Sequence, residues 1–209
     1  MVSAFGATDT PTSNGQDPTA LAQQMASWVK QYNLDGIDVD YEDFNAVNAG
    51  TAANWLSTFT SALRSNLPQG QYSISHAPLA PWFSSNTGAP YVEVNNRVGN
   101  KIDFYNIQFY NQGNLYESCE SLVSNSGGAY SGSSIMEIAA KGVDASKIVL
   151  GKVATQANAY SGGYMDASTL AGCVAQAQSK GWNGGVMGWQ YPEASSSWIQ
   201  AVRAKSWPA

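Results

Sequence analysis

The sequence has few charged residues and few cysteines. Only 12% of its 209 residues are charged, and 10 Lys and Arg stand against 15 Asp and Glu, for a net charge of −5. Such a chain lacks the clustered cations that neutralise phosphates, which excludes a nucleic-acid-binding protein. Its two cysteines, Cys119 and Cys173, allow one disulfide at most and have no metal-binding spacing. Whether they pair is left open by the sequence.

Long hydrophobic runs are also missing. No stretch approaches the roughly 20 apolar residues of a membrane span, and no charged and then apolar segment typical of a signal peptide opens the chain. We therefore expect no membrane association. Disorder is excluded as well, because 44% hydrophobic and 11% aromatic residues are enough to build a core.

Short apolar runs alternate with helix-periodic segments, the pattern of parallel strands joined by crossover helices. The predicted strands are 2–6, 36–42, 72–77, 104–110, 148–154 and 185–191. One helix is expected to begin at Asp17 and Pro18, a typical cap and first-turn pair. Further helices are expected over 51–67, 133–141, 166–180 and 194–204, and the Ser- and Gly-rich segment 115–132 is expected to be a loop.

Six strand–helix units point to an incomplete barrel. Eight units of about 35 residues make roughly 280 residues, near the usual size of a (β/α)8 barrel. We expect an α/β protein of TIM-barrel type with six of the eight units, forming one domain over residues 1–209 that lacks the first two units. An open doubly wound sheet also accounts for six strands, although no glycine-rich phosphate loop follows the first strand.

The most informative segment is the acidic strand 36–42. Strict alternation places Asp38, Asp40 and Glu42 on one face and the apolar residues between them on the other. Neighbouring carboxylates about 6.6 Å apart repel by about 2.5 kcal/mol at an effective dielectric near 20. One interpretation is an exposed edge strand, where such charges prevent aggregation. The apolar residues and the flanking helices instead favour a central strand whose acids turn inward, where one acid keeps its proton and acts as a general acid.

Several motifs resemble one family. Residues 35–42 read DGIDVDYE and match the Asp-Gly-x-Asp-x-Asp-x-Glu signature of glycoside hydrolase family 18, the chitinases and endo-β-N-acetylglucosaminidases, on its fourth barrel strand. Segments 108–111 (QFYN) and 184–189 (GGVMGW) resemble the sixth and eighth strands. Ala77-Pro78 and Leu150-Gly151 resemble the fifth and seventh strands of the hevamine-like plant and fungal branch. The third-strand Ser-x-Gly-Gly pattern reads SAFG at 3–6, with Phe5 in place of a glycine.

The resemblance assigns roles to particular residues. Glu42 would protonate the glycosidic oxygen while the substrate's own N-acetyl oxygen attacks the anomeric carbon, a retaining, substrate-assisted reaction. Asp40 would hold the acetamido N–H, and Asp38 would share a proton with Asp40. Tyr110 would donate its hydroxyl to the acetamido oxygen, and Trp189 would form the apolar floor under the sugar. Four residues would contact substrate, namely Gln108, Asn111, Trp189 and Tyr191.

Other chemistries have less support. His76 is the only histidine, and a metal site or a Ser-His-Asp triad would have to use it. Neither has support in the sequence. His76 stands where a predicted strand ends, so we expect a structural role or a minor substrate contact. The family chemistry implies no metal and no cofactor.

The resemblance implies a glycosidase that cleaves β-1,4-linked N-acetylglucosamine, most simply a secreted endo-chitinase. Chitin and the chitobiose core of N-glycans present the same sugar at the cleaved bond, so an endo-β-N-acetylglucosaminidase stays open. A non-catalytic carbohydrate-binding or inactive form is a further alternative, because two units are expected to be missing. The first and last strands would then lack neighbours, and we expect self-association through those edges.

Overall fold

The structure is a computed structural model that describes residues 1–207. The chain divides into two compact units, which we call unit 1 (Met1–Tyr105) and unit 2 (from Asn106 onward). Strands alternate with helices in both, and the strand pairs are parallel, as the sequence predicts. The single domain expected over residues 1–209 stays a prediction.

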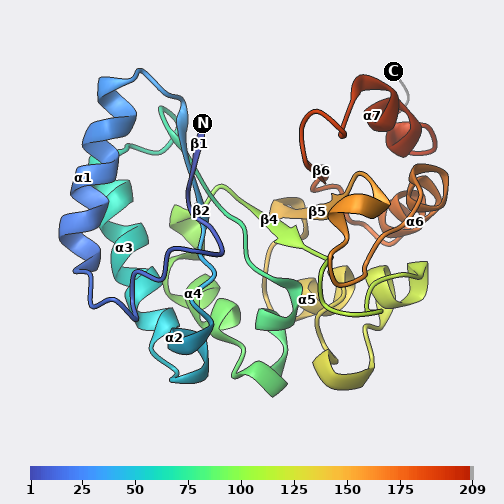
Figure 1. The fold of residues 1–209 in the computed structure, drawn as a ribbon, viewed down its shortest axis with the longest axis horizontal. Coiled ribbons are helices and arrows are strands. Elements are labelled where there is room, and N and C mark those ends of the chain that lie inside the picture. Colours follow the sequence, from blue (N-terminus) through green and yellow to red (C-terminus); the bar gives the residue numbers. More distant parts are fainter. Residues whose placement is uncertain (208–209) are drawn as a thin grey trace. The chain divides into compact units, whose positions relative to one another are not determined.

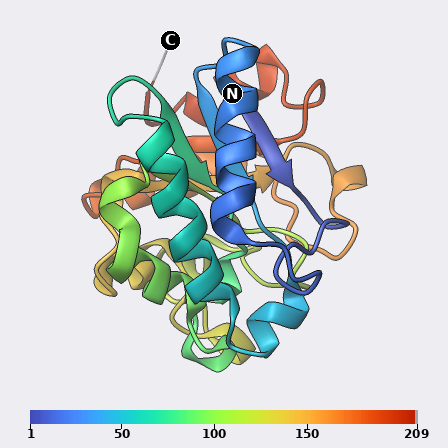
Figure 2. The same cartoon turned by 90° about the vertical axis from the view of Figure 1, so that its left-hand side faces the viewer.

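Unit 1 carries the acidic strand. Its elements are β1 (Val2–Phe5), α1 (Pro18–Gln31), β2 (Gly36–Asp40), α2 (Phe44–Asn48), α3 (Ala52–Asn66), β3 (Ser73–His76), α4 (Pro90–Val98) and the start of β4 (Phe104–Gln108). Short helical turns lie at Ala80–Phe83, Ser85–Thr87 and Gly99–Lys101. Helices α1 and α3 run side by side along the strands, as Figures 1 and 2 show.

The strand register of unit 1 separates an apolar face from a polar face. Ile37 of β2 pairs with Val2 of β1 and Ile74 of β3, and the side chains of Ile37 and Ile74 are buried. Residues in register on parallel strands point to the same side. The next residue of each strand therefore faces the opposite side, where β2 carries Asp38.

Helix α1 begins where the sequence predicts. Asp17 Oδ1 accepts a hydrogen bond from Ala20 N at 2.7 Å, and Pro18 occupies the first turn. The residues that α1 buries completely are small, namely Ala22, Ala26 and Val29.

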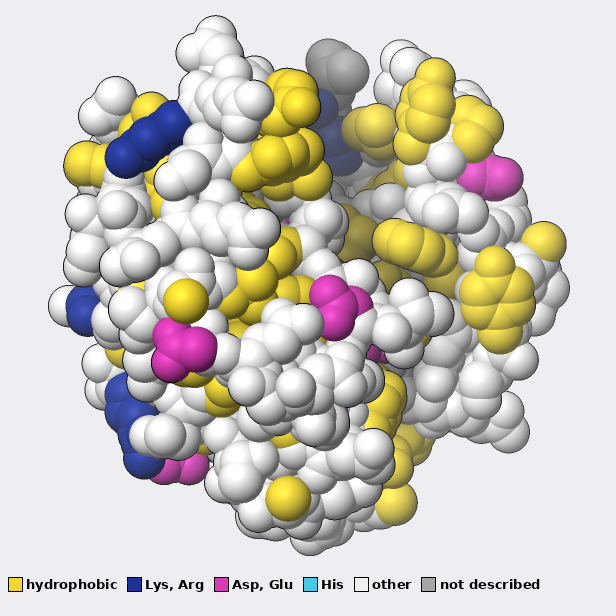
Figure 3. Space-filling view, turned by 60° about the vertical axis from the view of Figure 1, so that its left-hand side comes forward, with side chains coloured by type: hydrophobic (Ala, Val, Ile, Leu, Met, Phe, Trp, Pro, Cys, Tyr) yellow, Lys and Arg dark blue, Asp and Glu magenta, His cyan; other side chains and the backbone are white. Residues whose placement is uncertain are grey.

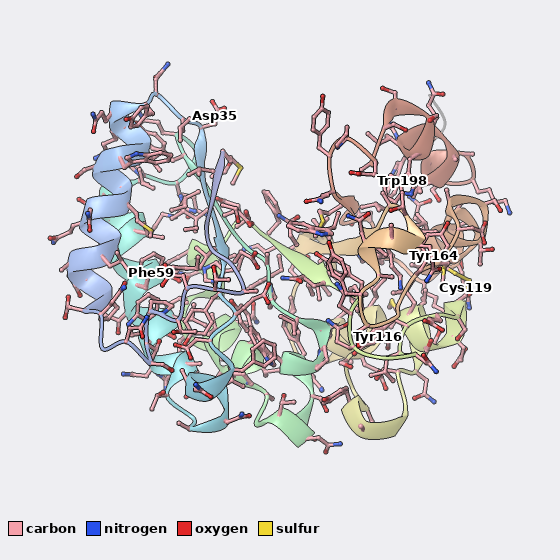
Figure 4. The ribbon with its side chains drawn as sticks, viewed as in Figure 1. Asp35, Phe59, Tyr116, Cys119, Tyr164 and Trp198 are labelled. Carbon is pink, nitrogen blue, oxygen red and sulfur yellow. A yellow bond between two sulfur atoms is a disulfide. The ribbon has the colours of Figure 1, made fainter. Side chains whose placement is uncertain are left out.

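Unit 2 holds the remaining strands. After the end of β4 its elements are α5 (Ile135–Ala140), β5 (Ile148–Val153), α6 (Ala167–Ser179), β6 (Val186–Trp189) and α7 (Ser196–Arg203). Short helical turns lie at Glu120–Ser124, Gly128–Tyr130, Ala145–Lys147 and Gln156–Asn158. A disulfide between Cys119 and Cys173 ties the segment after β4 to α6, which answers the question left open by the cysteine count (Figure 4).

Several predicted boundaries need correction. The acidic strand ends at Asp40 and not at residue 42, because Asp43 caps α2 and turns the chain out of the sheet. Segment 115–132 contains a helical turn at Glu120–Ser124, beside the disulfide. Helix α4 was not predicted at all.

Candidate active site

Asp38 is held in place by two serines. Its Oδ2 accepts a hydrogen bond from Ser3 Oγ at 3.0 Å, and its Oδ1 accepts one from Ser75 Oγ at 2.5 Å. Ser3 and Ser75 are its register partners on β1 and β3, so the three side chains form a polar row across three strands. The hydroxyls fix the plane of the carboxylate and supply donors to both of its oxygens.

Asp40 lies beside the end of β1. Its carbonyl oxygen accepts a hydrogen bond from Gly6 N at 2.7 Å. A side-chain carbon added at Gly6 would lie 3.8 Å from Asp40 Oδ2, so the backbone of residue 6 runs close to this carboxylate. Phe5, one residue earlier, has a φ of 80°, which is rare for a bulky side chain.

Glu42 lies between two anchored residues, just past the end of β2. Tyr41 is buried, its hydroxyl lies 2.7 Å from Thr12 Oγ1, and burial raises its pKa above the usual range. Asp43 is buried as well and accepts hydrogen bonds from Ser13 N at 2.7 Å and Ser13 Oγ at 2.5 Å. The loop between β1 and α1 therefore anchors the side chains on both sides of Glu42.

Sequence reasoning missed these supporting residues. Ser3 and Ser75 stand far from Asp38 in sequence, and only the strand register brings them together. A signal did exist for Asp43, because an Asp before a short apolar run is a typical helix cap. It accepts a hydrogen bond from Ala46 N at 3.1 Å in that role.

In unit 2, the predicted residues at the end of β4 form one segment. Gln108 ends the strand and is buried, and Tyr110 is 4% exposed. Asn111 follows with a φ of 62°, a left-handed conformation that asparagine tolerates. Its Oδ1 accepts a hydrogen bond from Ser161 N at 3.1 Å, and its Nδ2 donates one to Asn158 O at 3.4 Å. The Asn111 amide thus joins the loop after β4 to the loop after β5.

The predicted residues of β6 are more exposed. Trp189 ends the strand in register with Val153 of β5 and is 40% exposed. Tyr191 lies two residues further and is 88% exposed. An exposed indole face and an exposed phenol are the side chains that stack on sugar rings, so both suit the predicted contacts.

His76 has a structural environment, as expected. It is fully buried, with Nε2 3.1 Å from Thr60 Oγ1 on α3 and Nδ1 3.3 Å from the Tyr91 hydroxyl on α4. Burial lowers its pKa to about 3. A histidine enclosed by these helices has no access to a substrate.

Residues 1–207 contain no cluster of three or more His, Cys, Asp or Glu side chains placed to hold a metal ion. Within the same range, no helix has the length and apolar character that crossing a membrane requires.

The family comparison agrees with the motif on β2. Residues 5–205 match the model of glycosyl hydrolases family 18. The chain belongs to this family. It is similar to the crystal structure of a GH18 chitinase from Pseudoalteromonas aurantia, with 32% identity and a TM-score of 0.85, covering 98% of this chain and 74% of that one. A GH18 chitinase from Chromobacterium violaceum shares the fold at 17% identity and a TM-score of 0.70, covering 97% of this chain and 63% of that one.

Among curated proteins, chitinase 1 of Tulipa saxatilis subsp. bakeri is 33% identical over 82 residues, which are 39% of this chain and 24% of the tulip protein. The chain therefore spans about a quarter of that relative's length.

Membership of family 18 confirms the predicted resemblance and the α/β fold of TIM-barrel type with six of eight strand–helix units. The two serines on Asp38 and the anchored residues around Glu42 are additions that the structure makes to the predicted site.

Proposed function

We propose that this protein is an endo-acting chitinase that cleaves β-1,4 linkages between N-acetylglucosamine units with retention. The observation that carries the proposal is the family-18 acid motif on and just after β2, with Asp38 bonded by two serines and Glu42 held between two anchored neighbours. The similarity to the GH18 chitinase from Pseudoalteromonas aurantia over nearly the whole chain supports chitin as the substrate class.

In the proposed reaction, the Glu42 carboxyl protonates the glycosidic oxygen as the acetamido oxygen of the substrate attacks the anomeric carbon. Asp40 accepts a hydrogen bond from the acetamido N–H and offsets the positive charge of the resulting oxazolinium ion. Asp38 shares a proton with Asp40. The Glu42 carboxylate then takes a proton from the water molecule that opens the oxazolinium ring. This step returns Glu42 to its protonated form.

Unit 2 contributes the proposed binding groups. Tyr110 donates its hydroxyl to the acetamido oxygen, and Gln108 orients the same group. Trp189 packs its indole against the sugar ring. Asn111 and Tyr191 complete the set of proposed binding residues. Because the Asn111 side-chain amide already forms hydrogen bonds within unit 2, Asn111 affects substrate binding through the shape of its loop.

Substitution of Glu42 tests the mechanism. Glu42→Gln keeps the shape of the side chain and removes the transferable proton, so we expect hydrolysis of chitin oligosaccharides to fall by about 10²- to 10⁴-fold with binding nearly unchanged. Glu93→Gln is the matched control, because Glu93 is an exposed acid of unit 1 that pairs with Arg97 and should leave the rate unchanged. Wild-type turnover by Glu42→Gln removes Glu42 from the mechanism.

A second candidate substrate is the chitobiose core of N-glycans, which offers the same sugar to the same acid motif. Parallel assays on chitin oligosaccharides and on a high-mannose glycoprotein separate the two, and we expect cleavage of the first. Cleavage of the glycoprotein alone replaces the chitinase assignment with an endo-β-N-acetylglucosaminidase. Oligosaccharide binding with no cleavage of either substrate makes the protein a carbohydrate-binding form.

We further propose that the protein acts outside the cell. Chitin lies in extracellular structures, and the disulfide between Cys119 and Cys173 is of the kind that persists in oxidising compartments. Fractionation of the producing culture, with an assay for the protein in the medium, tests this location, and retention in the cytosol contradicts it.

We also propose that two copies associate through the free edge of β1. Among residues 1–207, β1 pairs only with β2. A groove of about 320 Å³ lies beside it, lined by apolar side chains that include Leu21, Met25 and Trp28 of α1. Trp28 is 42% exposed, and Figure 3 shows hydrophobic side chains at the surface of this side of unit 1.

Sedimentation velocity over a range of concentrations tests the association. We expect dimers of the wild-type chain and monomers of Trp28→Lys, with Tyr160→Lys, an exposed aromatic position of unit 2, as the control. A wild-type chain that stays monomeric at every concentration contradicts the proposal.

A further inference from the structure

Unit 2 contains a completely buried lysine that the proposed chemistry does not use. Lys152 on β5 has no exposed surface. Its Nζ donates hydrogen bonds to the carbonyl oxygens of Phe109 at 2.8 Å, Tyr116 at 2.6 Å and Gly163 at 2.8 Å. An ammonium group has three donors and no acceptor, so each of its hydrogens has a partner and the group is saturated by backbone.

These carbonyls come from two different loops. Phe109 and Tyr116 belong to the segment that follows β4, and Gly163 belongs to the loop that follows β5. Phe109 immediately precedes Tyr110 in the chain, so one bond from Lys152 reaches the peptide unit that links Phe109 to Tyr110. The Lys152 ammonium therefore connects both loops directly before Tyr110, whose hydroxyl is the proposed donor to the acetamido oxygen.

Direct contacts between the loops reinforce this connection. Asn111 N donates to Gly162 O at 3.0 Å, and Gly113 N donates to Ser161 O at 2.7 Å. At Gly163 φ is +84°, and a side-chain carbon there would lie 2.7 Å from Tyr110 Cα. The backbone of the second loop thus lies directly against the backbone of Tyr110.

We propose that Lys152 is a positioning residue for Tyr110, acting by holding the loops after β4 and β5 together against the backbone of Tyr110. The proposal rests on the proposed function, in which the Tyr110 hydroxyl contacts the substrate. Lys152 itself touches neither substrate nor reacting atoms, because its three donors are bound to carbonyls. A loosened Tyr110 donor weakens the interaction made in the transition state and lowers kcat.

The charge on Lys152 is sensitive to pH near neutrality. Burial lowers its pKa to about 7, and the negative charge of Glu117 opposes that shift. The Tyr116 phenol has its pKa raised to about 12 by burial and stays neutral over the same range. Segment 161–163 and β6 carry no ionisable side chain. Loss of the proton leaves an amine with two donors for three carbonyls, so one of the connections is broken.

Amide hydrogen exchange tests the connection without using activity. In Lys152→Met we expect the amides of Asn111 and Gly113 to exchange at least about tenfold faster, since hydrogen bonds to a charged group are lost. Lys141→Met is the matched control, because Lys141 also donates to a backbone carbonyl of unit 2, that of Gly132. Unchanged exchange at Asn111 and Gly113 in Lys152→Met overturns the proposal.

Kinetics on chitin oligosaccharides test the action through Tyr110. We expect Lys152→Met to lower kcat about tenfold with little change in KM, and to have almost no further effect in a Tyr110→Phe background, where the hydroxyl is already gone. Equal losses in both backgrounds overturn the positioning role. An inactive wild-type chain defeats the proposed function instead, and the exchange experiment still decides on the loop connection.

A milder variant covers the case in which Lys152→Met does not fold. Glu117 is exposed, and its Oε1 accepts a hydrogen bond from Gly163 N at 2.8 Å. Glu117→Gln keeps an acceptor there and removes the charge that favours the Lys152 ammonium. We expect the pH at which exchange of the Asn111 amide accelerates, after correction for intrinsic rates, to move to a lower value. An unchanged pH profile overturns the proposal.

Discussion

Acidification should destabilise the protein through its single histidine. His76 is enclosed between α3 and α4, and burial lowers its pKa to about 3 from the ordinary value of 6.5. In the unfolded chain the imidazole takes up a proton below about pH 6.5, whereas the folded state excludes that proton until about pH 3. The unfolded state therefore binds more protons in this window, and the free energy of unfolding falls as the pH decreases through it.

The size of the effect follows from the two pKa values. Their difference is 6.5 − 3 = 3.5, and at about 1.4 kcal/mol for each pKa unit it gives at most about 5 kcal/mol. The whole free energy of unfolding of a typical domain is about 5 to 15 kcal/mol. Protonation of this one side chain therefore removes up to a substantial share of that free energy.

Urea unfolding of the wild-type chain and of His76→Gln, followed by tryptophan fluorescence between about pH 7 and pH 4, measures the contribution. Glutamine can bond to the Thr60 and Tyr91 hydroxyls but does not titrate. Every carboxylate titrates in both proteins, so the difference between them isolates His76. We expect the wild-type advantage at pH 7 to shrink steadily as the pH falls. A difference that stays constant over this range refutes the reasoning.

Two further changes have expected outcomes. The disulfide between Cys119 and Cys173 spans 54 residues, and the chain-entropy relation gives about 4 kcal/mol for a loop of that length. Urea unfolding of the double Cys→Ser variant should show a loss of that order in the free energy of unfolding. An unchanged unfolding midpoint would contradict this prediction. At Phe5, whose φ is 80°, Phe5→Gly should be about 1 kcal/mol more stable than Phe5→Ala, because only glycine adopts this conformation without strain; the opposite order in the same assay would show that the backbone relaxes.

The acid motif could be predicted from sequence because its information is local. Alternation within residues 36–40 is enough to place Asp38 and Asp40 on one face of β2. The partners of Asp38 could not be predicted, because Ser3 and Ser75 are 35 and 37 residues away from it. Serines are common, and only the strand register selects these two.

The missed helix α4 shows a different limit. Its apolar positions Tyr91, Val94 and Val98 have helical spacing and are buried, and Pro90 stands in the first turn, so a signal was present. The helix begins after Ala89 in a left-handed conformation, with no side-chain cap. Without the usual start signal, a nine-residue helix is difficult to distinguish from loop.

At position 5 the chain departs from the family pattern that it otherwise resembles. The third-strand pattern of family 18 has a glycine where this chain has Phe5, and the backbone there still has the positive φ that glycine favours. The Phe5 ring packs against Trp55 and Phe59, at centroid distances of 5.9 and 5.5 Å, and this packing offsets the strain of about 1 to 3 kcal/mol. The turn carries Gly6 N to within 2.7 Å of Asp40 O. The requirement at this position is therefore the path of the chain past Asp40, which a well-packed aromatic residue meets as well as a glycine.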